Sequence, residues 1–126
     1  MLPLALLAFA GCDFPFASGA CTASVEPAIV VEIRDARNGA PLAGLAAGVV
    51  RDGAYVDSLR PAGFTDVNDP IGSMISRQAA SERPGTYDVE VRRDGFRPWT
   101  RTGVRARRGE CHVETQRLNA ALEPLP

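Results

Sequence analysis

The single histidine of the chain, His112, precedes Glu114 by two residues in a segment that we expect to be the last strand. Side chains two apart on a strand point to one face, so this pair could bind a metal ion or exchange protons. A solvent-facing pair on the outer face of the sheet is the simpler interpretation, because no second histidine and no CxxC spacing completes a metal site.

The spacing of the serines argues against a serine hydrolase. Those in the middle of the chain are Ser58, Ser73, Ser76 and Ser81. None of them lies in a Gly-x-Ser-x-Gly elbow, and one histidine would have to serve any triad. The sequence therefore predicts no catalytic residue, no metal and no cofactor, and a protein that is not an enzyme.

Two kinds of side chain could instead contact a ligand. Tyr55 and Trp99 could stack on a sugar ring, although a single tryptophan more often packs its ring on the core. Four arginines also lie close together in the sequence, namely Arg101, Arg105, Arg107 and Arg108. They could meet anionic lipid head groups or acidic glycans, or could form a solvated strand edge that blocks sheet-to-sheet aggregation.

Length and charge limit the class of protein. The 126 residues correspond to about one small domain. The chain has 14 basic residues, all of them arginine, and 15 acidic residues, which gives a net charge of −1. This charge argues against a nucleic-acid partner, which requires a strongly basic surface. A hydrophobic content of 45% excludes a wholly disordered chain, and 12 glycines with 10 prolines predict many turns.

The first eleven residues, MLPLALLAFAG, carry no charge. They are too few to span a bilayer, which needs about 20 apolar residues, but enough for the apolar region of a secretory signal, about 7–15. The sequence Ala10-Gly11-Cys12 resembles the lipobox of bacterial lipoproteins. This resemblance implies that the signal (1–11) is removed and that Cys12 carries a diacylglycerol. From their Pro, Ser and Gly, residues 13–20 are expected to form with Cys12 a short tether (12–20); the alternative is that Phe14 and Phe16 pad the edge of the domain. In the alternative, an ordinary signal is cut nearby and the exported protein carries no lipid.

The remaining cysteines form an even pair if Cys12 takes a lipid. Cys21 then precedes the first expected strand, and Cys111 opens the last one. In an oxidising compartment such a pair forms a disulfide. Two buried free thiols are the alternative.

Apolar alternation predicts the strands that would position these residues. Ile29, Val31 and Ile33 share one face of a strand, and so do Tyr87, Val89 and Val91. Turn pairs at Asn38-Gly39, Asp52-Gly53 and Asp94-Gly95 separate the strands.

Three further features complete the pattern of strands. Residues 61–84 are rich in glycine and proline, and we expect one short strand in them, at about Ser73–Gln78. Gly103 is expected at a bulge or at a point of close backbone approach. In the last strand the apolar positions switch from odd to even numbers, which predicts a bulge near Gln116-Arg117. About seven short strands indicate a small antiparallel β-sandwich.

The motifs that carry a family resemblance span about residues 25–124. In chain order they are Ile29-x-Val31-x-Ile33-x-Asp35, Asn38-Gly39-x-Pro41-Leu42, Gly85-x-Tyr87-x-Val89-x-Val91, Gly95-Phe96 and Leu122-x-Pro124. This set resembles the carboxypeptidase regulatory-like domain, a transthyretin-like Greek-key sandwich of seven strands. Cys21 and the segment 111–115 are similar to a disulfide-bearing variant on bacterial lipoproteins.

The resemblance implies a β-sandwich domain over residues 21–126 with a binding or structural role. We therefore expect a non-catalytic protein that a lipid holds on a bacterial membrane, facing the periplasm or the exterior. Its expected partners are the membrane and a protein or glycan ligand. The alternatives are a carbohydrate-binding module that uses Tyr55 or Trp99, and an accessory subunit of a separate envelope enzyme.

Overall fold

The strand β1 (Pro27–Asp35) is built from β-branched residues, which favour extended backbone. In the computed structural model, which describes residues 21–126, Ile29, Val31 and Ile33 are fully buried, as their alternation predicts. β1 pairs antiparallel with β5 (Met74–Ser81) and parallel with β8 (Gln116–Leu122). Both edges of β1 are therefore hydrogen-bonded, which makes it a central strand.

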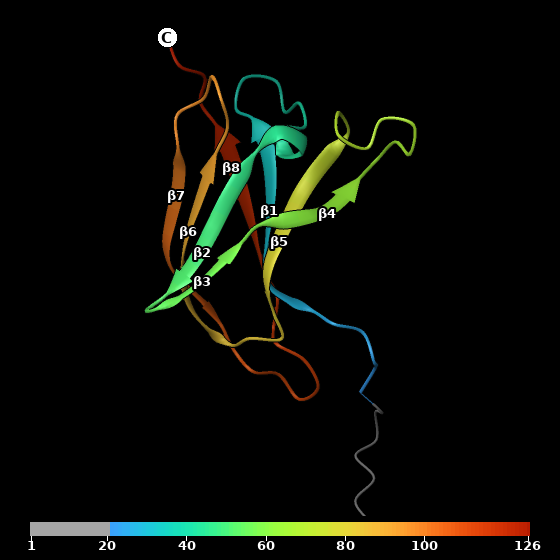
Figure 1. Cartoon of the computed structure of the whole chain (residues 1–126), viewed down its shortest axis with the longest axis vertical. Helices are drawn as coiled ribbons and strands as arrows, with labels where there is room; N and C mark the ends of the chain where they lie inside the picture. The colour runs from blue at the N-terminus through green and yellow to red at the C-terminus, as the bar shows by residue number, and fades with distance from the viewer. Residues whose placement is uncertain (1–20) are drawn as a thin grey trace, which may run out of the picture.

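Two four-stranded sheets form the molecule (Figure 1). The strand order is β4-β5-β1-β8 in the first sheet and β3-β2-β6-β7 in the second. The other elements are the 3-10 helix η1 (Ala43–Leu45) and the strands β2 (Ala47–Asp52), β3 (Tyr55–Ser58), β4 (Arg60–Phe64), β6 (Gly85–Arg92) and β7 (Trp99–Ala106). Residues 21–126 thus contain eight strands and no α-helix, which confirms the all-β sandwich.

Buried side chains from both sheets make one core. From β6, Tyr87, Val89 and Val91 point inward and are 0–2% exposed. They belong to the same buried cluster as Ile29 of β1 and Leu122 of β8, across the space between the sheets. The face assigned from the alternation of β6 is therefore confirmed.

The additional strand is β4, in the region that is difficult to interpret from the sequence. Leu59 is buried at the point where the chain leaves β3 in one sheet and enters β4 in the other. β4 is an edge strand with register shifts around Gly63, and such a strand tolerates Pro61, which lacks a backbone N–H. The short strand predicted at about Ser73–Gln78 is found as β5, three residues longer at its end.

The last strand begins later than the sequence predicts. Residues 111–115 are not part of it: β8 starts at Gln116, and Val113 makes only an isolated bridge to Arg108. The switch from odd to even buried positions therefore arises at a boundary between loop and strand, and no bulge at Gln116-Arg117 is needed. The sheet is also mixed rather than purely antiparallel, because β8 runs parallel to β1.

The bulge predicted at Gly103 is confirmed. The register between β6 and β7 shifts after Tyr87, and Gly103 has a φ of +68°, a conformation that favours glycine. Its backbone N–H donates to Asp88 Oδ1 at 3.1 Å, so the displaced N–H group keeps a partner.

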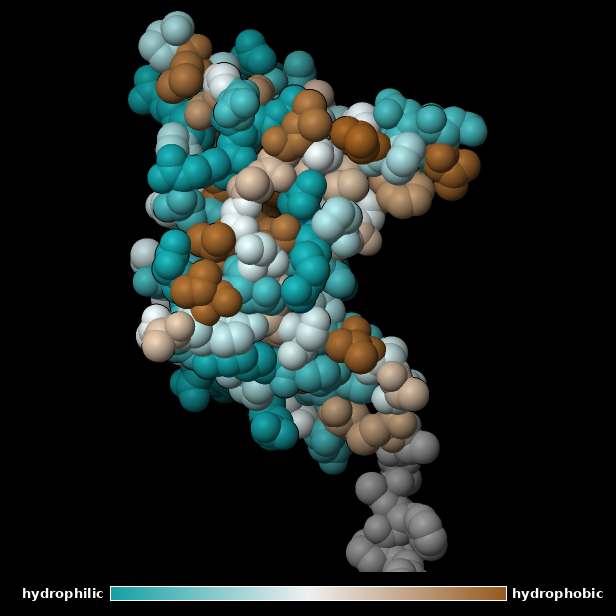
Figure 2. All heavy atoms as spheres, viewed as in Figure 1, coloured by the Kyte–Doolittle hydropathy of each residue, from teal (hydrophilic) through white to brown (hydrophobic). Residues whose placement is uncertain are grey.

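The loops gather at two opposite ends of the sandwich (Figure 1). Residues 21–26 leave the sandwich at the end that also carries the β5–β6 and β7–β8 connections; we call this the entry end. The opposite end carries the C-terminus and the projecting β4–β5 hairpin, where hydrophobic residues such as Phe64, Val67 and Ile71 are exposed (Figure 2). Among residues 21–126, no helix has the length and hydropathy to cross a membrane.

Shortening a core side chain of β6 should destabilise the sandwich. We expect Val89→Ala to lower the free energy of unfolding by about 1–3 kcal/mol, because apolar burial is lost and a cavity remains. Denaturant titration monitored by the fluorescence of Trp99 measures this change, and Glu114→Ala at an exposed position is the control. A midpoint equal to that of the wild type would mean that Val89 does not pack in the core.

Candidate functional site

A disulfide joins Cys21 to Cys111 at the entry end, with the two Cα atoms 5.1 Å apart. This distance lies within the range of about 4.4–6.8 Å that a disulfide requires, and the predicted pairing is confirmed. The bond connects the segment that leads into β1 with the loop between β7 and β8. It closes a loop across 90 positions of the sequence.

Glu82 organises the polar contacts beside this disulfide. It follows β5 directly and has a φ of +51°, in the left-handed region that is costly for a residue with a side chain. Two backbone hydrogen bonds hold it there: its N–H donates to the Glu26 carbonyl, and the Glu26 N–H donates to its Oε1, each at 2.8 Å. The start of β1 and the end of β5 are therefore joined through this carboxylate.

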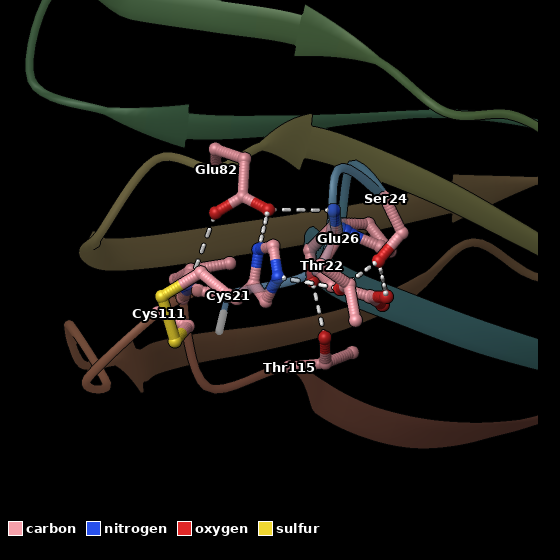
Figure 3. A network of polar contacts seen from close by, with 10 residues as sticks. Cys21, Thr22, Ser24, Glu26, Glu82, Cys111 and Thr115 are labelled. Carbon is pink, nitrogen blue, oxygen red and sulfur yellow. Dashed lines mark hydrogen bonds and ion pairs between the residues drawn. A yellow bond between two sulfur atoms is a disulfide. The ribbon is translucent and has the colours of Figure 1, made fainter. Parts of the chain in front are cut away.

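His112 links the same carboxylate to the β7–β8 loop and to Thr22. Figure 3 shows Glu82, Glu26 and Thr22 within this network. Its Nδ1 lies 2.6 Å from Glu82 Oε1, and its Nε2 lies 3.0 Å from the hydroxyl of Thr22. The N–H of Val113 donates to the other carboxylate oxygen of Glu82 at 3.2 Å. We call the five residues Thr22, Glu26, Glu82, His112 and Val113 the Glu82 clamp.

The hydrogen bonds of the clamp favour a charged Glu82. The N–H of Glu26 is the largest cause that lowers the pKa of Glu82; burial opposes it, and His112 and the Val113 N–H add to the lowering. A carboxyl whose pKa is lower in the folded state stabilises the fold above its unfolded pKa. This contribution disappears as the pH falls through the folded value.

The variant Glu82→Gln tests this linkage. A glutamine amide turns an N–H group toward backbone donors, so the variant should be less stable than the wild type at neutral pH. Between about pH 7 and pH 3 the two unfolding free energies should converge, because protonated Glu82 also loses its charge. Glu114→Gln, at an exposed carboxylate, should follow the wild-type curve. Parallel curves for Glu82→Gln and the wild type would contradict the proposed linkage.

The order of groups in the clamp is that of a catalytic triad: a carboxylate on Nδ1 and a hydroxyl on Nε2 of one imidazole. The Thr22 hydroxyl, however, also lies 2.7 Å from the hydroxyl of Ser24, at the surface. The small hollow beside the imidazole, about 70 Å³, is lined by His112 and Glu82 but not by Thr22. What the contacts do is hold three segments together: residues 22–26, the turn after β5, and the β7–β8 loop.

The predicted pair of His112 and Glu114 does not form. Because residues 111–115 are a loop, the alternation of a strand does not apply to them, and the His112 ring turns toward Glu82 while Glu114 stays exposed. The backbone of Glu114 is fixed by its N–H, which donates to the Arg107 carbonyl at 2.8 Å. No cluster of three metal-ligating side chains lies within residues 21–126.

The two aromatic residues proposed for ligand contact lie apart. Tyr55 is on β3 and Trp99 on β7, at opposite edges of the second sheet. Both rings pack partly against the core, and the guanidinium of Arg83 lies 3.8 Å over the Tyr55 ring. They do not form one joint stacking platform, and a glycan contact by either ring alone stays a prediction. Cys12, the signal segment 1–11 and the tether lie outside the described residues.

No model of a known protein family matches the chain, and no curated protein matches it. The sandwich, the disulfide and the clamp are therefore the observations on which a functional proposal rests.

Proposed function

We propose that the protein is a non-catalytic β-sandwich module that is exported and held on a bacterial membrane by a lipid on Cys12. Its role is binding or structural. The observation that carries this proposal is the Cys21–Cys111 disulfide, since such bonds form and persist in oxidising compartments outside the cytoplasm. Of the three cysteines in the sequence, Cys12 is the one left for a lipid.

The position of the disulfide also suits an anchored protein. A module held at its N-terminus experiences force through the segment before β1. The disulfide transfers that force to the β7–β8 loop. The Glu82 clamp adds the hydrogen bonds of Thr22 with His112 and of Glu26 with Glu82. The Thr115 hydroxyl, which donates to the Pro27 carbonyl at 2.6 Å, fastens the start of β1. These contacts prevent β1 from being peeled away from the first sheet.

The two-sheet architecture agrees with the family resemblance drawn from the sequence. We propose on this basis that residues 21–126 are a carboxypeptidase regulatory-like, transthyretin-type module. Small sandwich modules of this kind act through their surfaces and loops, which a rigid scaffold positions.

Replacement of the lipid acceptor tests the proposed function. The chain should be produced with residues 1–20 intact in a bacterial host, and the membrane fraction analysed by intact mass. We expect the wild type in the membrane with the mass of an acylated Cys12, and Cys12→Ser without that mass. Cys21→Ser is the matched control, because it removes a cysteine from the disulfide but keeps the acceptor. An acyl mass that persists in Cys12→Ser would contradict the anchor.

A further inference from the structure

Three arginines at the end of β7 surround an open hollow of about 420 Å³. Ala106, the last residue of β7, is buried, whereas its neighbours Arg105 and Arg107 are exposed. Arg108 follows as the chain leaves the strand, and Pro84, Gly85 and Thr86 form the opposite wall. We call this feature the arginine hollow.

The backbone that carries these arginines is held in place. The N–H of Glu114 donates to the Arg107 carbonyl at 2.8 Å, and Arg108 makes a bridge to Val113. The Gly109 N–H donates to the His112 carbonyl at 2.8 Å, and His112 is itself part of the Glu82 clamp. Hydrogen bonds therefore fix the backbone from which the side chains of Arg107 and Arg108 extend.

The charges of the hollow are not neutralised within the described chain. Other arginines of the sandwich pair with carboxylates at 2.5–3.2 Å, such as Arg60 with Asp57 and Arg83 with Asp52. Within residues 21–126, Arg105, Arg107 and Arg108 make no such ion pair. Three exposed guanidinium groups around one recess provide the positive charge and the N–H donors that a phosphate group requires.

The residues that line the hollow belong to the start of β6 and the end of β7 and the residues next to them. Both of these strand ends lie at the entry end, where residues 21–26 leave the sandwich (Figure 1). Cys21 lies nine positions after Cys12, and a fully extended chain of that length spans at most about 30 Å. A lipid on Cys12 would thus keep the entry end close to the membrane surface, within reach of its head groups.

We propose that the arginine hollow binds the phosphate groups of anionic phospholipids in the membrane that holds the anchor. This inference rests on the proposed function, because the anchor is what brings the hollow to the surface. The diacylglycerol supplies two acyl chains for attachment, and a basic patch beside it adds an electrostatic contact with anionic head groups. The hollow would also orient the module, with the β4–β5 hairpin directed away from the bilayer.

The expected strength follows from the charge count. Each arginine near an anionic surface contributes a factor of about five in partitioning, so three together contribute roughly 100-fold. The attraction is electrostatic, so it should weaken as the salt concentration rises.

The test uses the full chain with Cys12→Ser, which has no acyl anchor, and vesicle sedimentation. Vesicles of phosphatidylcholine with an equal amount of phosphatidylglycerol are compared with vesicles of phosphatidylcholine alone. The second kind sets the baseline, since residues 1–11 are common to all variants. We expect a preference for the anionic vesicles that falls roughly 100-fold when Arg105, Arg107 and Arg108 are all changed to glutamine.

The control variant changes three arginines outside the hollow to glutamine: Arg34, Arg60 and Arg97. It has the same net charge as the test variant, so it should keep most of the preference. Thermal unfolding checks that both variants are folded. Equal weakening in the two variants, or equal binding to both kinds of vesicle, would overturn the proposal. So would a sulfated glycan that binds the hollow more tightly than the vesicles do.

The two proposals fail separately. Lipidation of Cys12 is measured by mass on the wild type, whereas the vesicle assay uses a chain without the lipid. A wild type without an acyl mass, together with anionic binding by Cys12→Ser, would reject the anchor and keep the hollow. An acylated wild type, together with a Cys12→Ser chain that shows no preference for anionic vesicles, would reject the hollow alone.

Discussion

Replacing Cys21 and Cys111 together by serine should lower the free energy of unfolding by about 2–5 kcal/mol. The bond constrains the unfolded chain, and a loop of 90 positions lies near the upper end of that range, at about 4–5 kcal/mol in the chain-entropy model. The loss should be large for a small domain, whose total stability is about 5–15 kcal/mol. The Glu82 clamp should also weaken, because residues 22–26 are then held by hydrogen bonds alone.

Denaturant unfolding of the double variant and of the wild type measures the change. Cys12→Ser controls for the loss of a thiol outside the disulfide and should leave the stability of residues 21–126 unchanged. Reduction of the wild type by a thiol reagent should reproduce the midpoint of the double variant. A double variant as stable as the oxidised wild type would mean that the disulfide does not stabilise the fold.

Tyr87→Ala should produce a loss of similar size, about 3–5 kcal/mol. Tyr87 is the largest fully buried side chain of the core. Its ring packs edge-on to the Tyr55 ring, with the centroids 6.3 Å apart, and its hydroxyl donates to the Arg83 carbonyl. The variant removes the ring, the aromatic contact and this hydrogen bond together.

Tyr87→Phe separates these contributions. It keeps the ring and removes only the hydroxyl, which also accepts a hydrogen bond from Arg83 Nη1 at 3.1 Å. The loss should be about 1–3 kcal/mol, the usual range for two hydrogen bonds. Calorimetric or denaturant unfolding of both variants gives the comparison. If Tyr87→Ala were less destabilising than Val89→Ala, the central position of this ring in the core would be wrong.

The strands β1 and β6 could be predicted from the sequence because apolar residues alternate strictly along them. In each strand, these residues form the face that packs on the core. Ile29, Val31 and Ile33 in β1 are buried as expected, and so is the matching set in β6. Period-2 patterning is reliable where one face is buried, since a shift by one residue would expose the entire apolar set.

β4 could not be predicted because its residues, Arg60–Phe64, contain both proline and glycine. These residues oppose strand formation in general but are accepted at a sheet edge, and the edge position is set by tertiary packing. The sequence also predicts too early a start for β8, because tertiary contacts decide where this strand begins. Cys111 and Val113 alternate like strand residues, but the disulfide and the bridge from Val113 to Arg108 hold them in a loop.

The disulfide could be inferred from counting cysteines, whereas the Glu82 clamp could not be inferred. Glu82 and His112 are 30 positions apart, and no short motif connects them. The positive φ of Glu82 is also uncommon for this residue type, and propensity gives no indication of it. The cluster of four arginines was visible in the sequence, but only the fold shows that three of them, Arg105, Arg107 and Arg108, surround a hollow, whereas Arg101 lies over the Trp99 ring.

The central claim, that an exported module is held on a membrane through Cys12, is tested most directly by one mass measurement. Wild-type protein extracted from bacterial membranes should be analysed intact, without reduction, and again after treatment with a thiol reagent. The account predicts a chain that begins at Cys12, carries an acyl modification there, and gains the mass of two hydrogens on reduction of Cys21–Cys111. A chain without an acyl group, found in the soluble fraction with residues 1–11 still attached, would contradict it.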